Sequence, residues 1–167
     1  MPCDAADSAL KIVDFQEAHL PEILAIERAS FPRPWNARAF LAEARHPTAR
    51  IRVLLGPRGR VLGYAVFRRY DQAVHLLNLA VAPACRRQGL GRRLLEEVVQ
   101  QARRARLPWV VLEVRVSNRA AQRFYEAFGF RRIQRLPGYY DDEDGWLYLY
   151  EVPAAHRGGE AGEGEPA

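Results

Sequence analysis

The spacing of apolar residues changes several times along this chain, and each change marks the boundary of a predicted strand or helix. Apolar residues that alternate with polar ones predict strands, and apolar residues three and four positions apart predict amphipathic helices. The predicted strands are Ala9–Phe15, Ile51–Leu55, Arg60–Arg69, Ala73–Val81, Trp109–Val116, Phe130–Leu136 and Trp146–Val152. The predicted helices are Gln16–Ala29, Ala37–Ala44, Leu90–Arg106 and Asn118–Phe128. The order of elements is therefore β-α-α-β-β-β-α-β-α-β-β.

Turn-forming residues separate these elements. Pro32 and Pro34 cannot continue the first helix, and Asn36 is suited to cap the second. The turn Gly56–Gly59 predicts a hairpin, and Gly129 is suited to end the last helix. The third helix has one apolar stripe, which we expect to be buried: Leu90, Leu94, Leu95, Val98, Val99 and Ala102.

A strand, a helix and a second strand follow one another over residues 73–116, which implies a right-handed crossover between two parallel strands. The fold class is therefore mixed α/β, with helices on both faces of one sheet. A chain of 167 residues suits a single domain, which we place at residues 8–153. The flanking segments 1–7 and 154–167 are expected to be disordered.

Composition narrows the class of protein. No apolar segment is long enough to cross a bilayer, and the first residues lack the basic and apolar regions of a signal peptide. Cys3 and Cys85 form no metal-spaced cluster, and we expect reduced cysteines in a cytoplasmic protein rather than a disulfide. The net charge of +5 would suit nucleic acid, but the 25 basic residues are scattered and no binding motif accompanies them. Direct binding of nucleic acid is therefore not expected.

Candidate chemistry gathers over residues 79–92, where a strand leads through a basic turn into the third helix. Backbone N–H groups at a helix start bind anions, and the helix dipole adds partial positive charge. Gly89 and Gly91 lack side chains, so an anion can approach the backbone closely. Three arginines add charge to this turn: Arg86, Arg87 and Arg92. These residues predict a phosphate-binding turn, although a solvated connection would have the same composition.

The spacing of these residues is more specific than their composition. Arg86-x-x-Gly89-x-Gly91 resembles the acyl-CoA signature Q/R-x-x-G-x-G/A of the GCN5-related N-acetyltransferase (GNAT) superfamily. It differs from the dinucleotide pattern G-x-G-x-x-G, and it lacks the Lys-Ser/Thr pair of a nucleotide triphosphate loop. In that superfamily the turn holds the pyrophosphate of coenzyme A.

Two further residues are candidate acid–base groups. Glu113 lies in the middle of an apolar strand, where a buried charge is costly, so it either pairs with a cation such as Arg115 or lines a cleft as a general base. Tyr125 either finds one partner in the core or donates a proton in a cleft. It belongs to a stripe of the last helix that we expect to be buried: Ala121, Phe124, Tyr125 and Phe128.

The chain resembles one branch of the superfamily, the RimI-type ribosomal-protein alanine N-acetyltransferases. The resemblance spans about residues 10–150. It rests on I-E-x-x-S-F-P-x-P-W at Ile26–Trp35, on L-E-V-R-x-S-N-x-x-A-x-x-x-Y-x-x-x-G-F at Leu112–Phe130 and on Y-Y-x-x-E-D at Tyr139–Asp144. It implies the GNAT fold, in which a mixed, mostly antiparallel sheet of about seven strands is flanked by about four helices.

The resemblance also implies roles for individual residues. Acetyl-CoA would be bound by Leu79, Ala80, Val81, Arg86, Arg87, Gln88, Gly89, Leu90, Gly91, Arg92 and Asn118. Glu113 would be the general base and Tyr125 the general acid in direct transfer of acetyl to the N-terminal α-amine of a protein. The acceptor groove would be walled by Phe31, Trp35, Tyr139 and Tyr140. The reaction needs no metal and no membrane, and the enzyme would be a monomer or a weak homodimer.

Several alternatives stay open on the sequence alone. The acceptor could be a small amine, such as a polyamine, amino acid or drug, and a CoA-binding module without turnover is a third possibility. The final strand, Trp146–Tyr150, is more aromatic than the family's usual ending, which leaves the acceptor in doubt. The acidic run Asp141–Asp144 is either a solvated hairpin turn or an attractor for a cationic amine. The four histidines, His75 among them, have no convincing partner.

Overall fold

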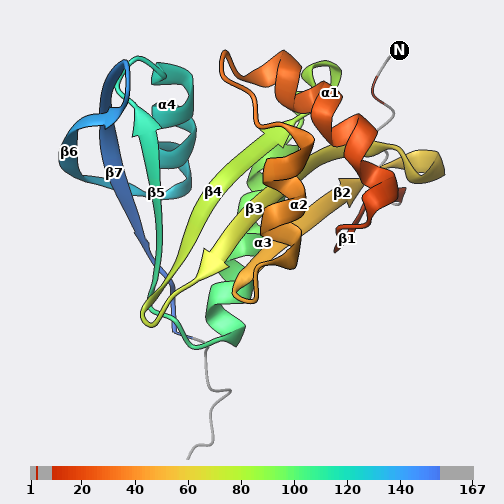
Figure 1. The fold of residues 1–167 in the computed structure, drawn as a ribbon. Helices are drawn as coiled ribbons and strands as arrows, with labels where there is room; N and C mark the ends of the chain where they lie inside the picture. Colours follow the sequence, from red (N-terminus) through yellow and green to blue (C-terminus); the bar gives the residue numbers. More distant parts are fainter. Residues whose placement is uncertain (1–2, 4–8, 155–167) are drawn as a thin grey trace, which may run out of the picture.

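A computed structural model describes Cys3 and residues 9–154 of the chain (Figure 1). The strands are β1 (Lys11–Asp14), β2 (Ala49–Leu55), β3 (Val61–Arg69), β4 (Ala73–Val81), β5 (Trp109–Arg115), β6 (Arg131–Tyr140) and β7 (Glu143–Glu151). The α-helices are α1 (Leu20–Ser30), α2 (Ala37–Arg45), α3 (Leu90–Arg104) and α4 (Arg119–Phe128). Three 3₁₀ turns, η2 (Glu17–His19), η3 (Pro57–Gly59) and η4 (Pro83–Cys85), precede α1, join β2 to β3, and follow β4.

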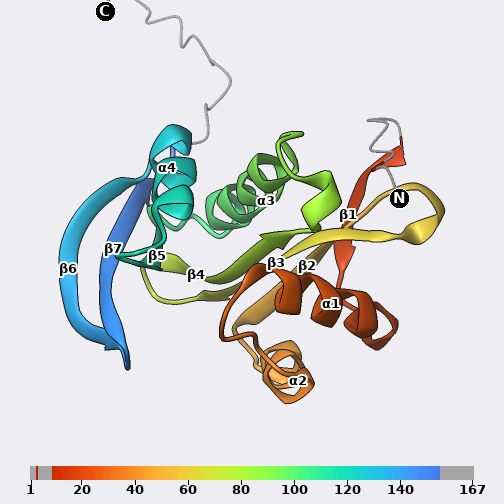
Figure 2. The ribbon, with the colours of Figure 1, turned by 90° about the horizontal axis from the view of Figure 1, so that it is seen from above.

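The described strands form one seven-stranded sheet in the order β1-β2-β3-β4-β5-β7-β6. β4 and β5 are parallel and connected through α3, and the other neighbouring pairs are antiparallel. α1 and α2 cover one face of the sheet, whereas α3 and α4 lie on the other (Figure 2). The prediction of a mixed, mostly antiparallel sheet with helices on both faces is confirmed.

β4 and β5 separate soon after they pair. Their ladder contains three pairs, and His75 with Val111 is the last of them. From Leu76 onward β4 pairs with β3 alone, through a bulge that increases the local twist. The two strands consequently diverge as a wedge that opens toward their carboxyl ends (Figure 1). Backbone groups on this side of β4 have no strand partner among the described residues, so they are available to a ligand.

The core lies on both faces of the central strands. The predicted stripe of α3 is buried at all six positions, and the prediction is confirmed: Leu90, Leu94, Leu95, Val98, Val99 and Ala102. On the opposite face, Ile23 and Ile26 of α1 and Phe40 of α2 are buried. Because both faces of β3 and β4 are covered in this way, the end of β4 is held rigidly beside the wedge.

α4 is packed differently from the prediction. Its expected buried stripe is only partly buried: Ala121, Phe124, Tyr125 and Phe128. The buried side chain of this helix is Gln122, whose amide donates to the carbonyls of Arg115 and Val116 at 3.0 and 2.9 Å. The expectation of burial is wrong because apolar residues spaced three and four positions apart identify the apolar side of a helix. They do not show whether that side packs on the core or borders a cavity. Here that face borders the wedge.

The last hairpin also differs from the prediction. β6 and β7 are longer than expected, and Asp141 and Asp142 alone form the turn. The long turn implied between the predicted strands, over residues 137–145, is therefore wrong. β6 contains Pro137 and Gly138, residues that usually interrupt a strand. The strand accommodates them because its register with β7 shifts between Leu136 and Tyr140.

Cys3 and Cys85 form a disulfide, with their Cα atoms 5.2 Å apart, where reduced thiols were expected. Cys85 is fully buried in η4, so the bond joins the start of the chain to the segment just before the basic turn. The predicted disorder of residues 1–7 and 154–167 falls almost entirely outside the described residues. None of the described helices has the length and apolar character needed to span a membrane.

Candidate active site

The basic turn between β4 and α3 presents backbone donors. Gly89 is the N-cap of α3 and has a φ of 77°, a left-handed conformation that glycine adopts without strain. The N–H of Arg93 donates to the carbonyl of Gly89 at 3.1 Å and begins the helical ladder. The N–H groups before it therefore have no helical partner, and together with the helix dipole they suit an anion.

Gly91 keeps a gap open beside this turn. A Cβ atom at position 91 would lie 3.3 Å from the Phe124 ring and 3.8 Å from Cγ2 of Val81. A side chain larger than a methyl group would therefore fill the space between the start of α3 and α4. Position 91 therefore favours glycine for a steric reason, whereas position 89 favours glycine because of its backbone conformation.

A cavity of about 620 Å³ lies between the turn, the end of β4 and α4, and we call it the turn cavity. Ten of the eleven residues predicted to bind CoA line it: Leu79, Ala80, Val81, Arg86, Arg87, Gly89, Leu90, Gly91, Arg92 and Asn118. Gln88 does not line it. Phe124 and Phe128 of α4 form an apolar wall. The cavity suits a ligand with an apolar arm and an anionic end.

Two of the arginines at the turn, Arg86 and Arg92, bond other groups of the protein. Arg86 donates from Nε to the carbonyl of Val81 at 3.2 Å and from Nη2 to Oγ of Ser30 at 2.9 Å. Arg92 pairs with Glu96 at 3.2 Å on the exposed side of α3. Arg86 therefore braces the turn against β4 and α1, a structural role that the sequence did not indicate.

A second cavity, of about 380 Å³, occupies the opening between β4 and β5, and we call it the wedge cavity. Its walls come from the loop after α1, from residues 76–79 and 112–115, from α4 and from Tyr140. It shares six wall residues with the turn cavity: Ser30, Phe31, Leu79, Asn118, Ala121 and Tyr125. The two cavities therefore adjoin, and a ligand in one can meet a ligand in the other.

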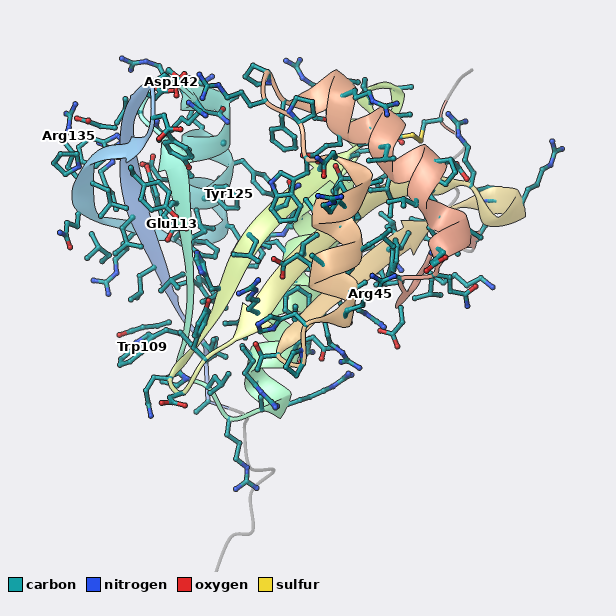
Figure 3. All side chains as sticks on the ribbon, in the orientation of Figure 1. Arg45, Trp109, Glu113, Tyr125, Arg135 and Asp142 are labelled. Atoms are coloured by element: carbon teal, nitrogen blue, oxygen red, sulfur yellow. A yellow bond between two sulfur atoms is a disulfide. The ribbon has the colours of Figure 1, made fainter. Side chains whose placement is uncertain are left out.

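Glu113 of β5 lines the wedge cavity (Figure 3). Its Oε2 lies 2.5 Å from Nε2 of His75 on β4. Arg115, the cation considered as its partner, instead bonds Asp142 at 2.7 Å and Glu143 at 3.1 Å. The expectation that His75 has no partner is wrong, because only the parallel register of β4 and β5 brings it beside Glu113.

Tyr125 of α4 lies where the two cavities adjoin (Figure 3). Its ring packs against Phe124 and Phe130, with ring centroids 5.1 and 5.5 Å apart. Burial, and to a lesser extent the neighbouring Tyr140, raise the pKa of the Tyr125 hydroxyl above its ordinary value. The hydroxyl therefore stays protonated at neutral pH and can act as a proton donor.

A second carboxylate, Glu27 of α1, also lines the wedge cavity although it is only 1% exposed. Its Oε1 accepts from the backbone N–H of Trp35 at 3.0 Å. Its Oε2 accepts from the Asn78 amide at 2.9 Å and from the Tyr64 hydroxyl. Burial, reinforced by the bond to Glu27, raises the pKa of Tyr64. Glu27 was not predicted to lie in the site. The sequence contained one indication of this, an acidic residue beside the apolar face of the first helix.

The residues predicted to wall an acceptor groove do not all behave alike. Phe31, Trp35 and Tyr140 line the wedge cavity, but Tyr139 does not and is 49% exposed. Burial raises the pKa of Tyr140 to about 12. Burial first, and then the charge of Glu113, raise the pKa of Tyr139, whose hydroxyl is therefore close to that carboxylate.

The acidic run braces the mouth of the wedge. Glu143 accepts from the hydroxyl of Ser117 at 2.8 Å and from its N–H at 3.1 Å. These bonds and the Arg115 guanidinium hold the pKa of Glu143 below its usual value. Asp142, already bonded to Arg115, lies 3.6 Å from the guanidinium of Arg33 in the loop after α1. The run is therefore engaged with the start of α4 and with this loop, and it is not simply a solvated turn.

The arrangement joins a carboxylate, a protonated phenol and unpaired strand backbone around one space. Such groups can remove a proton from an incoming nucleophile, stabilise a developing oxyanion and protonate a leaving group. Among the described residues, no three His, Cys, Asp or Glu side chains are placed to hold a metal ion.

Comparisons of sequence place the chain among known acetyltransferases. Residues 20–130 match the acetyltransferase (GNAT) family. The ribosomal protein bS18-alanine N-acetyltransferase of Escherichia coli K12 is 31% identical over 134 residues, which cover 80% of this chain and 89% of that protein. An uncharacterized N-acetyltransferase of Methanocaldococcus jannaschii is 34% identical over 144 residues, covering 84% of this chain and 91% of that protein.

Comparisons of structure agree. The crystal structure of the ribosomal-protein-S18-alanine N-acetyltransferase from Escherichia coli superposes with a TM-score of 0.77 at 28% identity, covering 89% of this chain and 97% of that one. Ard1 from Thermoplasma volcanium superposes with a TM-score of 0.80 at 27% identity, covering 87% and 99%. The similarity in fold therefore extends over most of the chain.

Proposed function

The chain belongs to the acetyltransferase (GNAT) family, and we propose that it transfers acetyl from acetyl-CoA to the N-terminal α-amine of a protein. The E. coli relative is named as an alanine N-acetyltransferase of ribosomal protein bS18, which supports a protein acceptor of this kind. In this proposal residues 8–153 form one catalytic domain.

Acetyl-CoA would occupy the turn cavity. The N–H groups at the start of α3 would hold the pyrophosphate, because they combine unpaired donors with the positive end of a helix. The gap that Gly91 leaves against Phe124 would admit the chain of the cofactor. The unpaired edge of β4 at Leu79–Val81 would bond the pantetheine arm and direct the thioester toward the wedge cavity.

The acceptor would occupy the wedge cavity. Glu27 and Glu113 both line it, so its wall carries two carboxylates suited to an amine that arrives as a cation. Phe31, Trp35 and Tyr140 would contact the first residues of the acceptor. Arg33 and Asp142 close one side of the opening, which would restrict the acceptor to an extended chain end.

The residues would act in sequence. Glu113 takes a proton from the α-amine, which is largely protonated at neutral pH because its pKa is about 7.7–8.0. The amine nitrogen bonds the acetyl carbonyl carbon, and an N–H of Leu79–Val81 stabilises the oxyanion. Glu113 returns the first proton to solvent and then takes the second proton from the nitrogen of the tetrahedral intermediate. The carbonyl re-forms as the carbon–sulfur bond breaks, and Tyr125 gives its proton to the departing thiolate. Tyr125 recovers that proton from solvent.

One observation carries the proposal: Glu113 and Tyr125 line the same cavity, and Tyr125 lies where that cavity adjoins the one that suits acetyl-CoA. Release of CoA thiol should therefore require a peptide with a free N-terminus. A short peptide beginning with alanine should react at least tenfold faster than the same peptide with a blocked N-terminus, and faster than spermidine. A preference for spermidine would reject the protein acceptor.

Two substitutions test the acid–base roles. Glu113→Gln and Tyr125→Phe should each lower kcat for the alanine peptide at least tenfold, because each removes one proton transfer. Glu151→Gln, at the exposed end of β7, is the matched control and should leave kcat unchanged. Unchanged rates in the first two variants would remove both assignments.

A further inference from the structure

The carboxylate of Glu113 is held by a side chain from the neighbouring strand. His75 Nε2 lies 2.5 Å from Glu113 Oε2, and both side chains are mostly buried, 19% and 16% exposed. His75 is not among the residues that line the wedge cavity, whereas Glu113 is. His75 therefore contacts the carboxylate from behind, away from the space proposed for the acceptor.

The position of His75 in the sheet explains why it can do this. Its pair with Val111 is the last between β4 and β5 before the strands diverge. Glu113 lies two residues farther along β5, on the same face as Val111, where β4 has already turned away. A long side chain at position 75 is therefore placed to reach across the narrow end of the wedge and hold the Glu113 carboxylate.

The chemistry of the pair sets the direction of the hydrogen bond. An ionised carboxylate can only accept, so Nε2 must carry the hydrogen and donate it. A donor on one oxygen limits the rotation of the carboxylate, and Glu113 lines the wedge cavity in this orientation. A base that must be aimed at the acceptor before each turnover benefits from this restraint.

Several other aromatic and charged side chains lie near His75 and Glu113, and the arginines among them are bonded to other residues. The Tyr70 ring lies 6.0 Å from the His75 ring, and the Tyr139 hydroxyl approaches Glu113 from β6. Arg68 pairs with His75 in the β3–β4 ladder, but its guanidinium bonds Glu43 of α2 at 2.8 and 2.6 Å. Tyr140 is also close enough to Glu113 to feel its charge, and the Arg115 guanidinium stacks on the Tyr140 ring at 4.2 Å and is bonded to Asp142 and Glu143.

We propose that His75 is a positioning residue for the general base, which donates from Nε2 to Glu113 and keeps that carboxylate turned into the wedge cavity. This inference rests on the proposed role of Glu113. It assigns His75 no contact with the acceptor or with acetyl-CoA. It therefore predicts an effect on kcat with little effect on KM.

The kinetic test uses two substitutions at one position. His75→Leu removes the donor and should lower kcat for the alanine peptide about tenfold, with both KM values within twofold, because one charge-assisted hydrogen bond is lost. His75→Gln places an amide donor at similar reach and should restore most of kcat.

Two controls separate positioning from packing. Tyr70→Phe keeps the ring beside His75 and should leave kcat unchanged. His46→Leu removes a histidine from the end of α2, which packs on β2, three strands away from β5, and should do the same. If His75→Leu kept the kcat of the wild type, if its main effect were on KM, or if His75→Gln failed to recover, the positioning role would be wrong.

A spectroscopic measurement without substrate keeps the inference distinct from the proposed function. In protein labelled with ¹⁵N-histidine, the side-chain N–H signal of His75 is identified by its loss in His75→Leu. A hydrogen bond to the Glu113 carboxylate should place this proton well downfield, and Glu113→Gln should shift it. If no peptide were acetylated but the signal moved as stated, the proposed function would fail while the contact stood. An unmoved signal would overturn the inference whatever the activity.

Discussion

Because Gly91 has no side chain, the turn cavity stays open between the start of α3 and α4. Gly91→Val would press a branched side chain against Phe124 and Val81, which already lie 3.3 and 3.8 Å from a Cβ atom there. We expect the KM for acetyl-CoA to rise about tenfold or more, since each factor of ten needs only about 1.4 kcal/mol of lost binding. Steady-state kinetics with acetyl-CoA varied would measure this change.

The matched variant is Gly91→Ala, whose methyl group requires a shift of only a few tenths of an ångström in the Phe124 ring. Its KM for acetyl-CoA should stay within about threefold of the wild type. Equal effects of alanine and valine would contradict the steric account, as would a Gly91→Val protein that binds acetyl-CoA normally.

Single residues show what the sequence could and could not predict. The spacing of Gly89 and Gly91 identified the turn because the reason for each glycine is local. His75 and Glu113 are 38 residues apart in the sequence. Their contact depends on the register of β4 with β5, which no local sequence pattern reveals. Arg115 was the wrong partner for the same reason: it lies on the same face two residues away, but the hairpin β6–β7 supplies its acids.

Among the elements, α1 is fastened to the sheet by one buried carboxylate. Glu27→Ala would leave the Tyr64 hydroxyl, the Asn78 amide and the Trp35 N–H without their acceptor. Each buried donor without a partner costs about 1–3 kcal/mol, so we expect the free energy of unfolding to fall by at least about 2 kcal/mol. Denaturant unfolding would measure the loss.

Glu22, which lies on the same helix and is exposed, provides the control for Glu27. Its Oε2 accepts from the N–H of Val61 at 3.0 Å, a single bond at the edge of the fold. Glu22→Ala should cost clearly less than Glu27→Ala. Equal losses would show that the three bonds of Glu27 do not fasten α1 to the sheet.

The hairpin of β6 and β7 should respond to acid. Bonds from Ser117 and Arg115 lower the pKa of Glu143 in the folded protein. A carboxyl group whose pKa is lowered by folding stabilises the fold above its unfolded value of about 4.3, and that contribution disappears as pH falls through the folded value. Thermal unfolding should therefore show a midpoint that falls between about pH 5 and pH 3.

Glu143→Gln isolates this contribution because glutamine does not titrate. Its unfolding midpoint should be lower than that of the wild type at pH 7, and the difference should shrink as the pH approaches 3. A difference that is constant across this interval would mean that the charge of Glu143 contributes nothing to the hairpin.

Elements with a strong period were predicted more closely than irregular ones. α3 begins at the predicted residue and buries the predicted stripe, because fifteen residues with one apolar face admit a single packing. The bounds of β6 and β7 were wrong because Pro137 and Gly138 mark a turn in most sequences, whereas here a register shift absorbs them. α4 was assigned correctly as a helix but to the wrong environment.

At the scale of the whole molecule, the wedge between β4 and β5 is the feature from which both cavities follow. The sheet was predicted to be mixed, yet the early end of the β4–β5 ladder was not, because it arises from the bulge in β4 and from the pairing of β5 with β7 on its other side. Sequence alone indicated which residues carry chemistry, and the fold supplies the space in which they meet.

The most direct test of this account is the position of an acetyl group after one reaction. The protein is mixed with ¹³C-labelled acetyl-CoA and a peptide that begins with alanine and also contains a lysine, and the product is fragmented in a mass spectrometer. We predict that the label is on the α-nitrogen of the first residue and that it appears at least tenfold more slowly with Glu113→Gln. Label on the lysine alone, no label, or an unchanged rate in the variant would contradict the account.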